Sequence, residues 1–268
     1  MHLSPRFEWL GMVFDIPTML MIVVTSIIVF LLILGLTRKL TAGVPGGAQN
    51  FLEWVVEFIA GIAGGFMEKK ISAKFVTLGL TLFLYIFIGN QLGLLFNVNV
   101  VYKDEISPRF MQMLTLSGND QLTQQKHELV VEELKSEHGL PVAYWKSPTA
   151  APSVTFSLAL MVLLYAHFLS IKKNGVGKYI KHYFEPNPLM FLLHAMEEFI
   201  IKPLTMPLRL FGNIFAGEVL IGVLLSAGAA VIALPIWLGY SVFVGAVQAY
   251  IFTTLTMVYI SQKVNDEH

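Results

Sequence analysis

The stretch Pro203–Leu220, PLTMPLRLFGNIFAGEVL, places Arg209 among leucines and phenylalanines, with Asn213 and Glu218 following it. A guanidinium keeps its proton at any workable pH. At the centre of a membrane helix an arginine costs about 2.5–3.5 kcal/mol on insertion scales. An arginine retained in such a segment therefore indicates a functional site, provided that the segment lies in a membrane.

The overall composition meets that condition. The chain is 55% hydrophobic and only 13% charged, with a mean hydropathy of +0.67, whereas soluble domains carry about 25% charged residues. The hydrophobic periods are helical, so we predict an all-α integral membrane protein. A formal net charge of zero argues against a nucleic-acid partner, and the absence of cysteine excludes disulfides and thiolate metal sites. No cofactor is expected.

Five apolar segments are long enough to cross the hydrocarbon core, which takes about 20 helical residues. They are residues 17–36, 75–96, 152–171, 188–228 and 235–261. Basic residues mark alternate ends of these segments as cytoplasmic. The marks are Arg38 and Lys39, then Lys69, Lys70 and Lys74, and finally Lys172, Lys173, Lys178 and Lys181. We expect a multi-pass protein of the cell membrane with its N-terminus outside and its C-terminus in the cytoplasm.

The last two crossings are too long to stand upright. As one helix, residues 188–228 would measure about 60 Å, roughly twice the hydrocarbon thickness. This segment must tilt strongly or break, and Pro203 and Pro207 are the candidate breaks. Residues 235–261 would measure about 40 Å and also require tilt.

Two segments outside the crossings have a character of their own. Residues 48–68 carry an apolar face at helical spacing and predict an amphipathic helix at the cytoplasmic interface. Residues 97–147 form a polar extracytoplasmic loop, in which Ser117–His138 predicts a short exposed helix capped by Ser117 or Asn119. No linker divides the chain, so residues 1–268 are expected to form a single membrane domain.

Several polar residues admit more than one interpretation. Asn90 and Gln91, near the outer end of the second crossing, either hydrogen-bond to a neighbouring helix or line an aqueous vestibule. His167 is either a packed histidine, which we favour, or a proton relay. The histidines and glutamates of the outer loop resemble metal ligands only weakly, because a mixed charge run is usually a solvated face.

Helical angles sort the residues around Arg209 by depth. Asn213 shares its face, whereas Glu218 is nine residues further on, about 13.5 Å along the axis and half a turn round. Glu218 is therefore a separate outer station and not an ion-pair partner within one straight helix. In the last helix, Ser241 and Gln248 share a face. Inward of the arginine stand His194, Glu197 and Glu198.

These residues carry a resemblance to a known family. Leu208-Arg209-Leu210-Phe211-Gly212-Asn213 followed by Ala216-Gly217-Glu218 is similar to the signature of the a subunits of F-type ATP synthases. The last helix adds a second match, Gln248-Ala249-Tyr250-Ile251-Phe252. The resemblance extends over most of the chain, including Gln49-Asn50-Phe51 and Gly89-Asn90.

The resemblance implies a stator subunit that offers two offset half-channels to the carboxylates of a rotating ring of c subunits. Its partners would be that ring, the b subunits of the peripheral stalk, membrane lipid and the transported H⁺, or else Na⁺. Arg209 would separate the half-channels, and the subunit itself would not be catalytic. The residues implied in ion translocation are Arg209, Glu218, Asn213, Gln248 and Ser241, with Asp15, Glu197, Glu198 and His194 as further half-channel candidates.

Some positions depart from the family pattern. Ala151 and Ser153 stand where the family often has Asp and Asn, and Pro207 stands where a small residue is usual. Ser241 replaces a histidine or another polar group of other members. Residues 103–138 look like an insertion relative to compact bacterial forms.

Two other classes of protein fit the sequence less well. A stand-alone channel or secondary transporter would favour inverted repeats and paired broken helices, which the sequence lacks. A membrane enzyme that binds haem or a metal would need two histidines on facing helices, and the crossings offer His167 and His194 singly.

Overall fold

The computed structural model describes residues 3–38, 40–41, 43–44, 46–96, 98–103, 106–136, 139–182, 190–226 and 230–264. Side chains at several positions of the last two helices, including Asn213 and Glu218, lie outside this description. The chain is mostly helical, as predicted.

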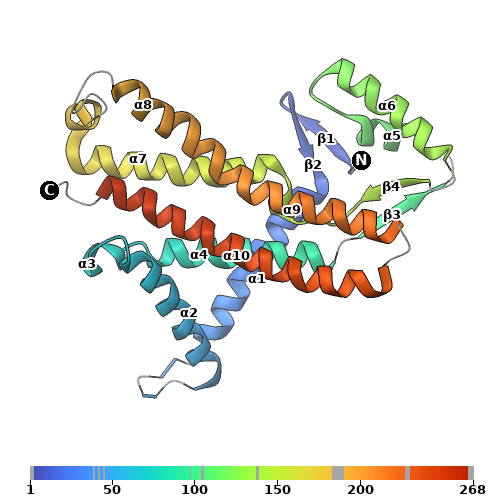
Figure 1. Ribbon diagram of the computed structural model, residues 1–268. Helices are drawn as coiled ribbons and strands as arrows, with labels where there is room; N and C mark the ends of the chain where they lie inside the picture. Colours follow the sequence, from blue (N-terminus) through green and yellow to red (C-terminus); the bar gives the residue numbers. More distant parts are fainter. Residues whose placement is uncertain are drawn as a thin grey trace.

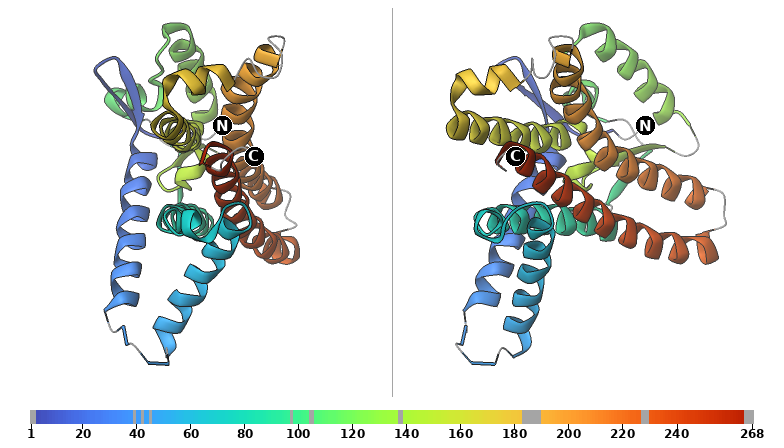
Figure 2. Two further views of the ribbon diagram at one scale, coloured as in Figure 1. Left: turned by 90° about the vertical axis from the view of Figure 1, so that its left-hand side faces the viewer. Right: turned by 60° about the vertical axis from the view of Figure 1, so that its left-hand side comes forward.

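Four long helices lie side by side and form the main bundle (Figures 1 and 2). They are α4 (Val76–Leu95), α7 (Pro152–His182), α9 (Lys202–Ser226) and α10 (Ala230–Val264). Helix α10 contacts the other three, and α7 also contacts α9. The C-terminal helix is therefore the common neighbour through which the bundle is joined.

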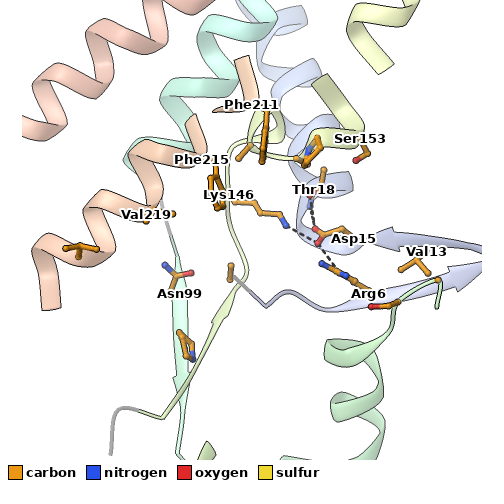
Figure 3. Close-up of a pocket in the computed structure, with 18 residues that line it drawn as sticks. Arg6, Val13, Asp15, Thr18, Asn99, Lys146, Ser153, Phe211, Phe215 and Val219 are labelled. Carbon is orange, nitrogen blue, oxygen red and sulfur yellow. Dashed lines mark hydrogen bonds and ion pairs between the residues drawn. The ribbon is translucent and has the colours of Figure 1, made fainter. Parts of the chain in front are cut away.

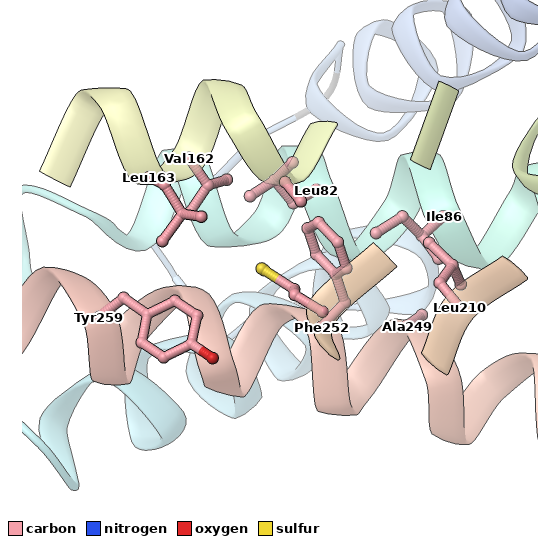
Figure 4. Close-up of a cluster of buried hydrophobic side chains, with 10 residues drawn as sticks. Leu82, Ile86, Val162, Leu163, Leu210, Ala249, Phe252 and Tyr259 are labelled. Carbon is pink, nitrogen blue, oxygen red and sulfur yellow. The ribbon is translucent and has the colours of Figure 1, made fainter. Parts of the chain in front are cut away.

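The core of the bundle follows from helical spacing. Met206 and Leu210 are four residues apart on α9, so they share one face, and both are almost fully buried. They pack with Leu82 and Ile86 of α4 and with Phe252 of α10 (Figure 4). Between them, Leu208 and Arg209 are exposed.

Two helices form an arm that diverges from the bundle, α1 (Ile16–Thr37) and α2 (Gly47–Gly64) (Figure 1). A short helix, α3 (Lys69–Ser72), leads from α2 to α4. Val55 and Ile59 of α2 are buried, while Phe51 and Trp54 are exposed. The apolar side chains of α2 are therefore divided between positions packed against the protein and exposed positions.

A lobe that contains short strands covers one end of the bundle. It comprises β1 (Arg6–Trp9), β2 (Met12–Asp15), β3 (Asn99–Tyr102), α5 (Pro108–Thr115), α6 (Asp120–Leu134), β4 (Leu140–Ala143) and the 3₁₀ turn η1 (Pro148–Ala150). Strand β1 pairs with β2, and β3 pairs with β4, both antiparallel. Helix α6 begins after Asn119, whose side chain accepts a hydrogen bond from Gln121 N.

The expectation of an all-α chain missed these strands. Leu10 and Gly11, between β1 and β2, have φ values of +53° and +75°. A two-residue turn with both φ values positive matches the right-handed twist of a hairpin. Leucine rarely adopts this conformation, so Gly11 was the only residue of the turn whose type indicated a hairpin.

The segment predicted to tilt or break is interrupted before its prolines. Helix α8 (Met190–Met196) passes into the π-helical turn η2 (Glu197–Ile201), and α9 then starts at Lys202. Pro203 cannot donate to the carbonyl four residues earlier, and its ring clashes with that carbonyl. The clash explains why the widened turn lies immediately before Pro203. Pro207, by contrast, is accommodated inside α9.

Four helices of the described residues are long and apolar enough to cross a membrane. They are Ile16–Thr37, Val76–Leu94, Pro152–Lys181 and Pro235–Val264. The third has one non-helical residue, Gly175, at φ +76°, close to the end of the predicted crossing. The segment that carries Arg209 is not among the four.

We predict that Gly93→Ala destabilises the fold by about 1–3 kcal/mol, as overpacking does elsewhere. An added Cβ at Gly93 would lie 2.4 Å from the backbone N of Ser147, so α4 and the η1 loop would have to separate. Thermal unfolding of the purified protein in detergent measures the effect. Gly61→Ala is the matched control, because its Cβ would meet nothing within 4 Å. Equal melting temperatures for the two variants would contradict the prediction.

Candidate functional site

Arg209 lies on α9 next to the buried Leu210, yet its own side chain is exposed. Among the described residues, no carboxylate forms an ion pair with this guanidinium. This bundle helix therefore presents a cation that no described carboxylate neutralises. In an apolar surrounding such a group requires a counter-charge.

The two candidates on α10, Gln248 and Ser241, have buried polar atoms or side chains. Gln248 is 6% exposed and has no hydrogen bond to Arg209 in the described structure. The Oγ of Ser241 is buried and has no hydrogen-bond partner among the described residues, and the same holds for Thr253 and Thr254 of this helix. Buried polar atoms are nearly always satisfied by protein or by ordered water, so these hydroxyls require partners other than the described residues.

The inner candidates differ sharply from one another. Glu198 is buried and accepts hydrogen bonds from Lys202 and Lys263, each at 2.8 Å. Glu197 is half exposed, with its Oε1 3.3 Å from Lys202 Nζ. His194 is partly buried. The sequence predicted the two glutamates as equivalent inner carboxylates but did not identify either lysine partner.

His167 is packed among side chains, as favoured from the sequence. Its ring stacks on Phe199 with centroids 5.9 Å apart, and its Nδ1 lies 3.0 Å from the hydroxyl of Tyr179. Its Nε2 lies 3.6 Å from Glu198.

Asp15 is the centre of a polar cluster at the other end of the bundle (Figure 3). Its carboxylate accepts hydrogen bonds from Ser4, from Lys146 Nζ at 2.9 Å and from the backbone N and side chain of Thr18. Arg6 Nε lies 3.8 Å away. Burial by itself raises the pKa of Asp15, but the Lys146 charge and these hydrogen bonds together hold it below its ordinary value of 3.8.

A cavity of about 1010 Å³ lies beside this cluster. Its polar wall includes Asp15, Lys146 and Ser153, with Ala151 close by. Its other wall comes from α9, from the part that follows Arg209 in sequence, and consists of Phe211, Phe215, Val219 and Val223 (Figure 3). The same helix thus carries the arginine and borders the cavity.

Asn90 and Gln91 form helix–helix hydrogen bonds, the first of the two interpretations. Asn90 Nδ2 donates to the carbonyl of Gly245 at 3.1 Å, and Gln91 donates to that of Val242 at 3.2 Å. Thr149 donates to Asn90 Oδ1 and thereby orients its amide. These bonds attach α4 and η1 to α10 about one turn from Gln248.

Within the described residues, no group of three or more His, Asp or Glu side chains is placed to hold a metal ion. Glu137 and His138, two residues of the weak metal pattern, lie outside that description.

These observations define a helical multi-pass membrane protein in which one bundle helix exposes an arginine between a partly buried and a buried ionic cluster. The chain matches the family described as ATP synthase A chain over residues 19–261. It is 40% identical over 275 residues to ATP synthase subunit a of Priestia megaterium, covering 100% of this chain and 99% of that protein. The subunit a of Bacillus subtilis is 38% identical over 283 residues, covering 100% of this chain and 99% of that protein. That of Listeria monocytogenes serotype 4b is 39% identical over 274 residues, covering 98% of each chain.

The chain therefore belongs to the ATP synthase A chain family. It is a membrane subunit of the Fo sector that serves proton translocation, and it is not itself catalytic.

We predict that the Asp15 cluster anchors the N-terminal hairpin until the pH falls below about 4. A carboxyl with a depressed pKa stabilises the fold above its unfolded pKa and loses that contribution as pH falls through its folded pKa. At pH 7, Asp15→Asn should therefore speed hydrogen exchange of the β1–β2 hairpin, because Lys146 loses its counter-charge. The difference between the variant and the native protein should shrink as the pH falls through the lowered pKa of Asp15.

Glu8→Gln is the control for this experiment, since Glu8 is exposed on the same hairpin. Identical exchange in Asp15→Asn and the native protein at pH 7 would show that the cluster does not anchor the hairpin.

Proposed function

We propose that this subunit provides two offset half-channels to the carboxylates of a c-subunit ring and that Arg209 separates them. The observation that carries the proposal is the exposed guanidinium on α9, which has no carboxylate partner among the described residues. A carboxylate that moves past this surface would supply the missing counter-charge. Pairing with a cation stabilises the ionised carboxylate, so the ring group would release its proton there.

A fixed cation would also block a direct leak between the half-channels. Each elementary charge that crosses 100 mV releases about 2.3 kcal/mol. A proton that moved directly from one half-channel to the other would be repelled by the guanidinium. The proton is instead carried around by the rotating ring. In this proposal Arg209 both promotes proton release from the ring carboxyl group and forms the barrier between the half-channels.

The outer half-channel is assigned to the cavity beside Asp15 and to the part of α9 and α10 that adjoins it. The cavity is bordered by α9 beyond Arg209, and Glu218 and Asn213 belong to that part of the helix. The unpaired hydroxyl of Ser241 and the buried Gln248 support a hydrated path along α10. Asp15 contributes at the mouth, where its ion pair with Lys146 keeps it ionised.

The inner half-channel is assigned to the side of Arg209 that leads to η2. Glu197 has a side-chain exposure of 52%, which suits an acidic group at an aqueous mouth, and His194 lies one turn before it. Glu198, also a candidate from its sequence position, has a different environment because it is buried between two lysines.

For the arrangement in the membrane we propose a single domain with five crossings, in which the fourth contains α8, η2 and α9. The fourth and fifth crossings would be strongly tilted, and α2 would lie at the cytoplasmic interface. The N-terminus and residues 97–147 would lie outside and the C-terminus inside the bacterial cell membrane. In support, the strand-containing lobe and the C-terminal end of α10 lie at opposite ends of the bundle (Figure 1).

The proposed partners are the c-subunit ring against α9 and α10, the b subunits of the peripheral stalk and lipid. Large apolar side chains exposed on α1, such as Phe30 and Leu31, require such cover. The transported ion is H⁺, with Na⁺ as the alternative, since the ring carboxylate site would decide between them.

Arg209→Ala should reduce ATP-driven proton pumping by at least about 100-fold, because an electrostatic group of this kind acts directly on the transferred charge. Arg209→Lys should recover little, since an ammonium lacks the planar donor fork of arginine. Pumping is measured in inverted membrane vesicles, and assembly is checked by the membrane content of the subunit. Arg109→Ala, at an exposed position of α5, is the matched control. Native pumping by Arg209→Ala would refute the assignment.

The topology can be tested with single cysteines, because the chain has none of its own. Glu128→Cys on α6 should react with a membrane-impermeant maleimide in intact cells. Lys172→Cys on α7 should react only after the membrane is opened. Both positions are exposed, so a reversed pattern would reverse the proposed orientation.

A further inference from the structure

The buried ionic cluster at the inner end of the bundle, which we call the Glu198 cluster, consists of Glu198, Lys202 and Lys263. Both ammonium groups donate to the same oxygen, Glu198 Oε1, at 2.8 Å each. The three side chains are 10%, 8% and 7% exposed. Charges this deeply buried occur only when they are paired.

The surroundings complete the arrangement. Lys202 Nζ also donates to Gln262 Oε1 at 2.9 Å and lies 5.4 Å from the centre of the Tyr259 ring. The second oxygen of Glu198 faces His167 Nε2 at 3.6 Å. A further charged neighbour among the described residues is Glu197, 3.3 Å from Lys202 on the exposed side.

The cluster therefore joins three parts of the chain that are far apart in sequence. Glu198 belongs to η2, Lys202 opens α9, Lys263 ends α10 and His167 belongs to α7. Glu198 in the π-helical turn and Lys202, four residues later, are in contact where the chain enters α9. The inner end of α9 is thus anchored against both of its neighbours.

Arg209 lies on the helix that this anchor holds. Lys202 and Arg209 are seven residues apart, which is about 10.5 Å along the axis and within about 20° of the same helix face. Rotation of α9 about its axis, or sliding along α10, would carry the guanidinium with it. Between the two residues, Pro207 removes one backbone hydrogen bond, so the helix by itself is a weaker guide for the arginine than an uninterrupted one.

We propose that Glu198 and Lys263 are positioning residues, which set the rotation and height of α9 and hence the place at which Arg209 meets the ring carboxylate. The inference rests on the proposed role of Arg209. The inference also gives the two inner glutamates different roles. Glu198 positions α9, whereas Glu197 lies at the aqueous mouth of the inner half-channel.

The competing assignment makes Glu198 a proton carrier. Protonation of Glu198 would leave two buried ammonium groups sharing one neutral acceptor, which is unfavourable in a dry site. Removal of Lys263 should, on that assignment, leave a carboxylate that accepts protons more readily. On the positioning assignment, removal of either partner breaks the same contact between η2 and α10.

The test compares Glu198→Gln, Lys263→Gln and the exchange Glu198→Lys with Lys263→Glu in the assembled complex in inverted vesicles. The exchange keeps one carboxylate between two ammonium groups, with the carboxylate now on α10. We expect each single variant to lower ATP-driven pumping at least about tenfold, as displacements near 1 Å do at reacting groups. The exchanged pair should return to within about threefold of the native protein, because coupled neighbours do not act additively.

Passive proton conduction through Fo, measured over a range of pH after removal of the catalytic head, gives the second readout. The pH profile of the residual conduction should match that of the native protein, since a positioning residue does not exchange the transported proton. Lys172→Gln, an exposed lysine of α7, serves as the charge-matched control and should pump normally.

Each other outcome overturns the proposal. Native pumping by Glu198→Gln would contradict the positioning role. The role would also be contradicted if Lys263→Gln pumped normally while Glu198→Gln did not pump. If the single variants do not accumulate in the membrane, the exchanged pair decides. Failure of that pair to accumulate or to pump contradicts the proposal, because it conserves the pattern of charges.

The failure of this inference is distinguishable from that of the proposed function. Arg209→Ala measured in the same vesicles reports on the function. Loss of pumping there, together with normal pumping by Glu198→Gln, rejects the positioning role alone.

Discussion

A charge that is withdrawn from water must be paired with another charge or offered to one, and the architecture of this protein depends on that constraint. At one end of the bundle Asp15 is held by Lys146, and at the other Glu198 is held by Lys202 and Lys263. Both pairings connect residues from distant parts of the chain. They therefore act as fixed points between which the apolar helices pack through Leu82, Phe252 and their neighbours.

Arg209 is the exception, because no carboxylate among the described residues pairs with it. Its neighbours Met206 and Leu210 bury an adjacent face of α9, while the guanidinium itself is exposed. The proposed mechanism uses this exposure directly, since the partner that neutralises the arginine is a carboxylate carried past it. In this view the paired charges of the two ionic clusters hold α9 in place. The same helix presents Arg209, whose charge has no partner among the described residues.

Much of the architecture could be predicted from local sequence patterns. Apolar length identifies the crossings, and the segments predicted at residues 17–36, 75–96, 152–171 and 235–261 coincide with the four candidate spans. The arginine motif and its resemblance likewise identified the family that the comparisons confirm. These predictions succeed because bilayer thickness and the cost of burying a charge act on contiguous residues.

The details of the sites could not be predicted in this way. The β1–β2 hairpin turns through Leu10, a residue with no turn preference, and the interruption near Pro203 lies in η2, before the proline. Glu197 and Glu198 are neighbours in sequence with almost identical local context. Their different environments arise from Lys263, which is more than sixty residues away.

The sequence by itself determined that the chain is a helical membrane protein with an arginine of functional importance, because hydrophobic length and charge cost are local properties. Only the tertiary structure decided which charges are neutralised and which remain available. Pairing depends on distances of about 3 Å between atoms of different helices, and those distances follow from how the helices pack. It is therefore the packing of α7, α9 and α10 that encloses Glu198 between two lysines and leaves Arg209 exposed.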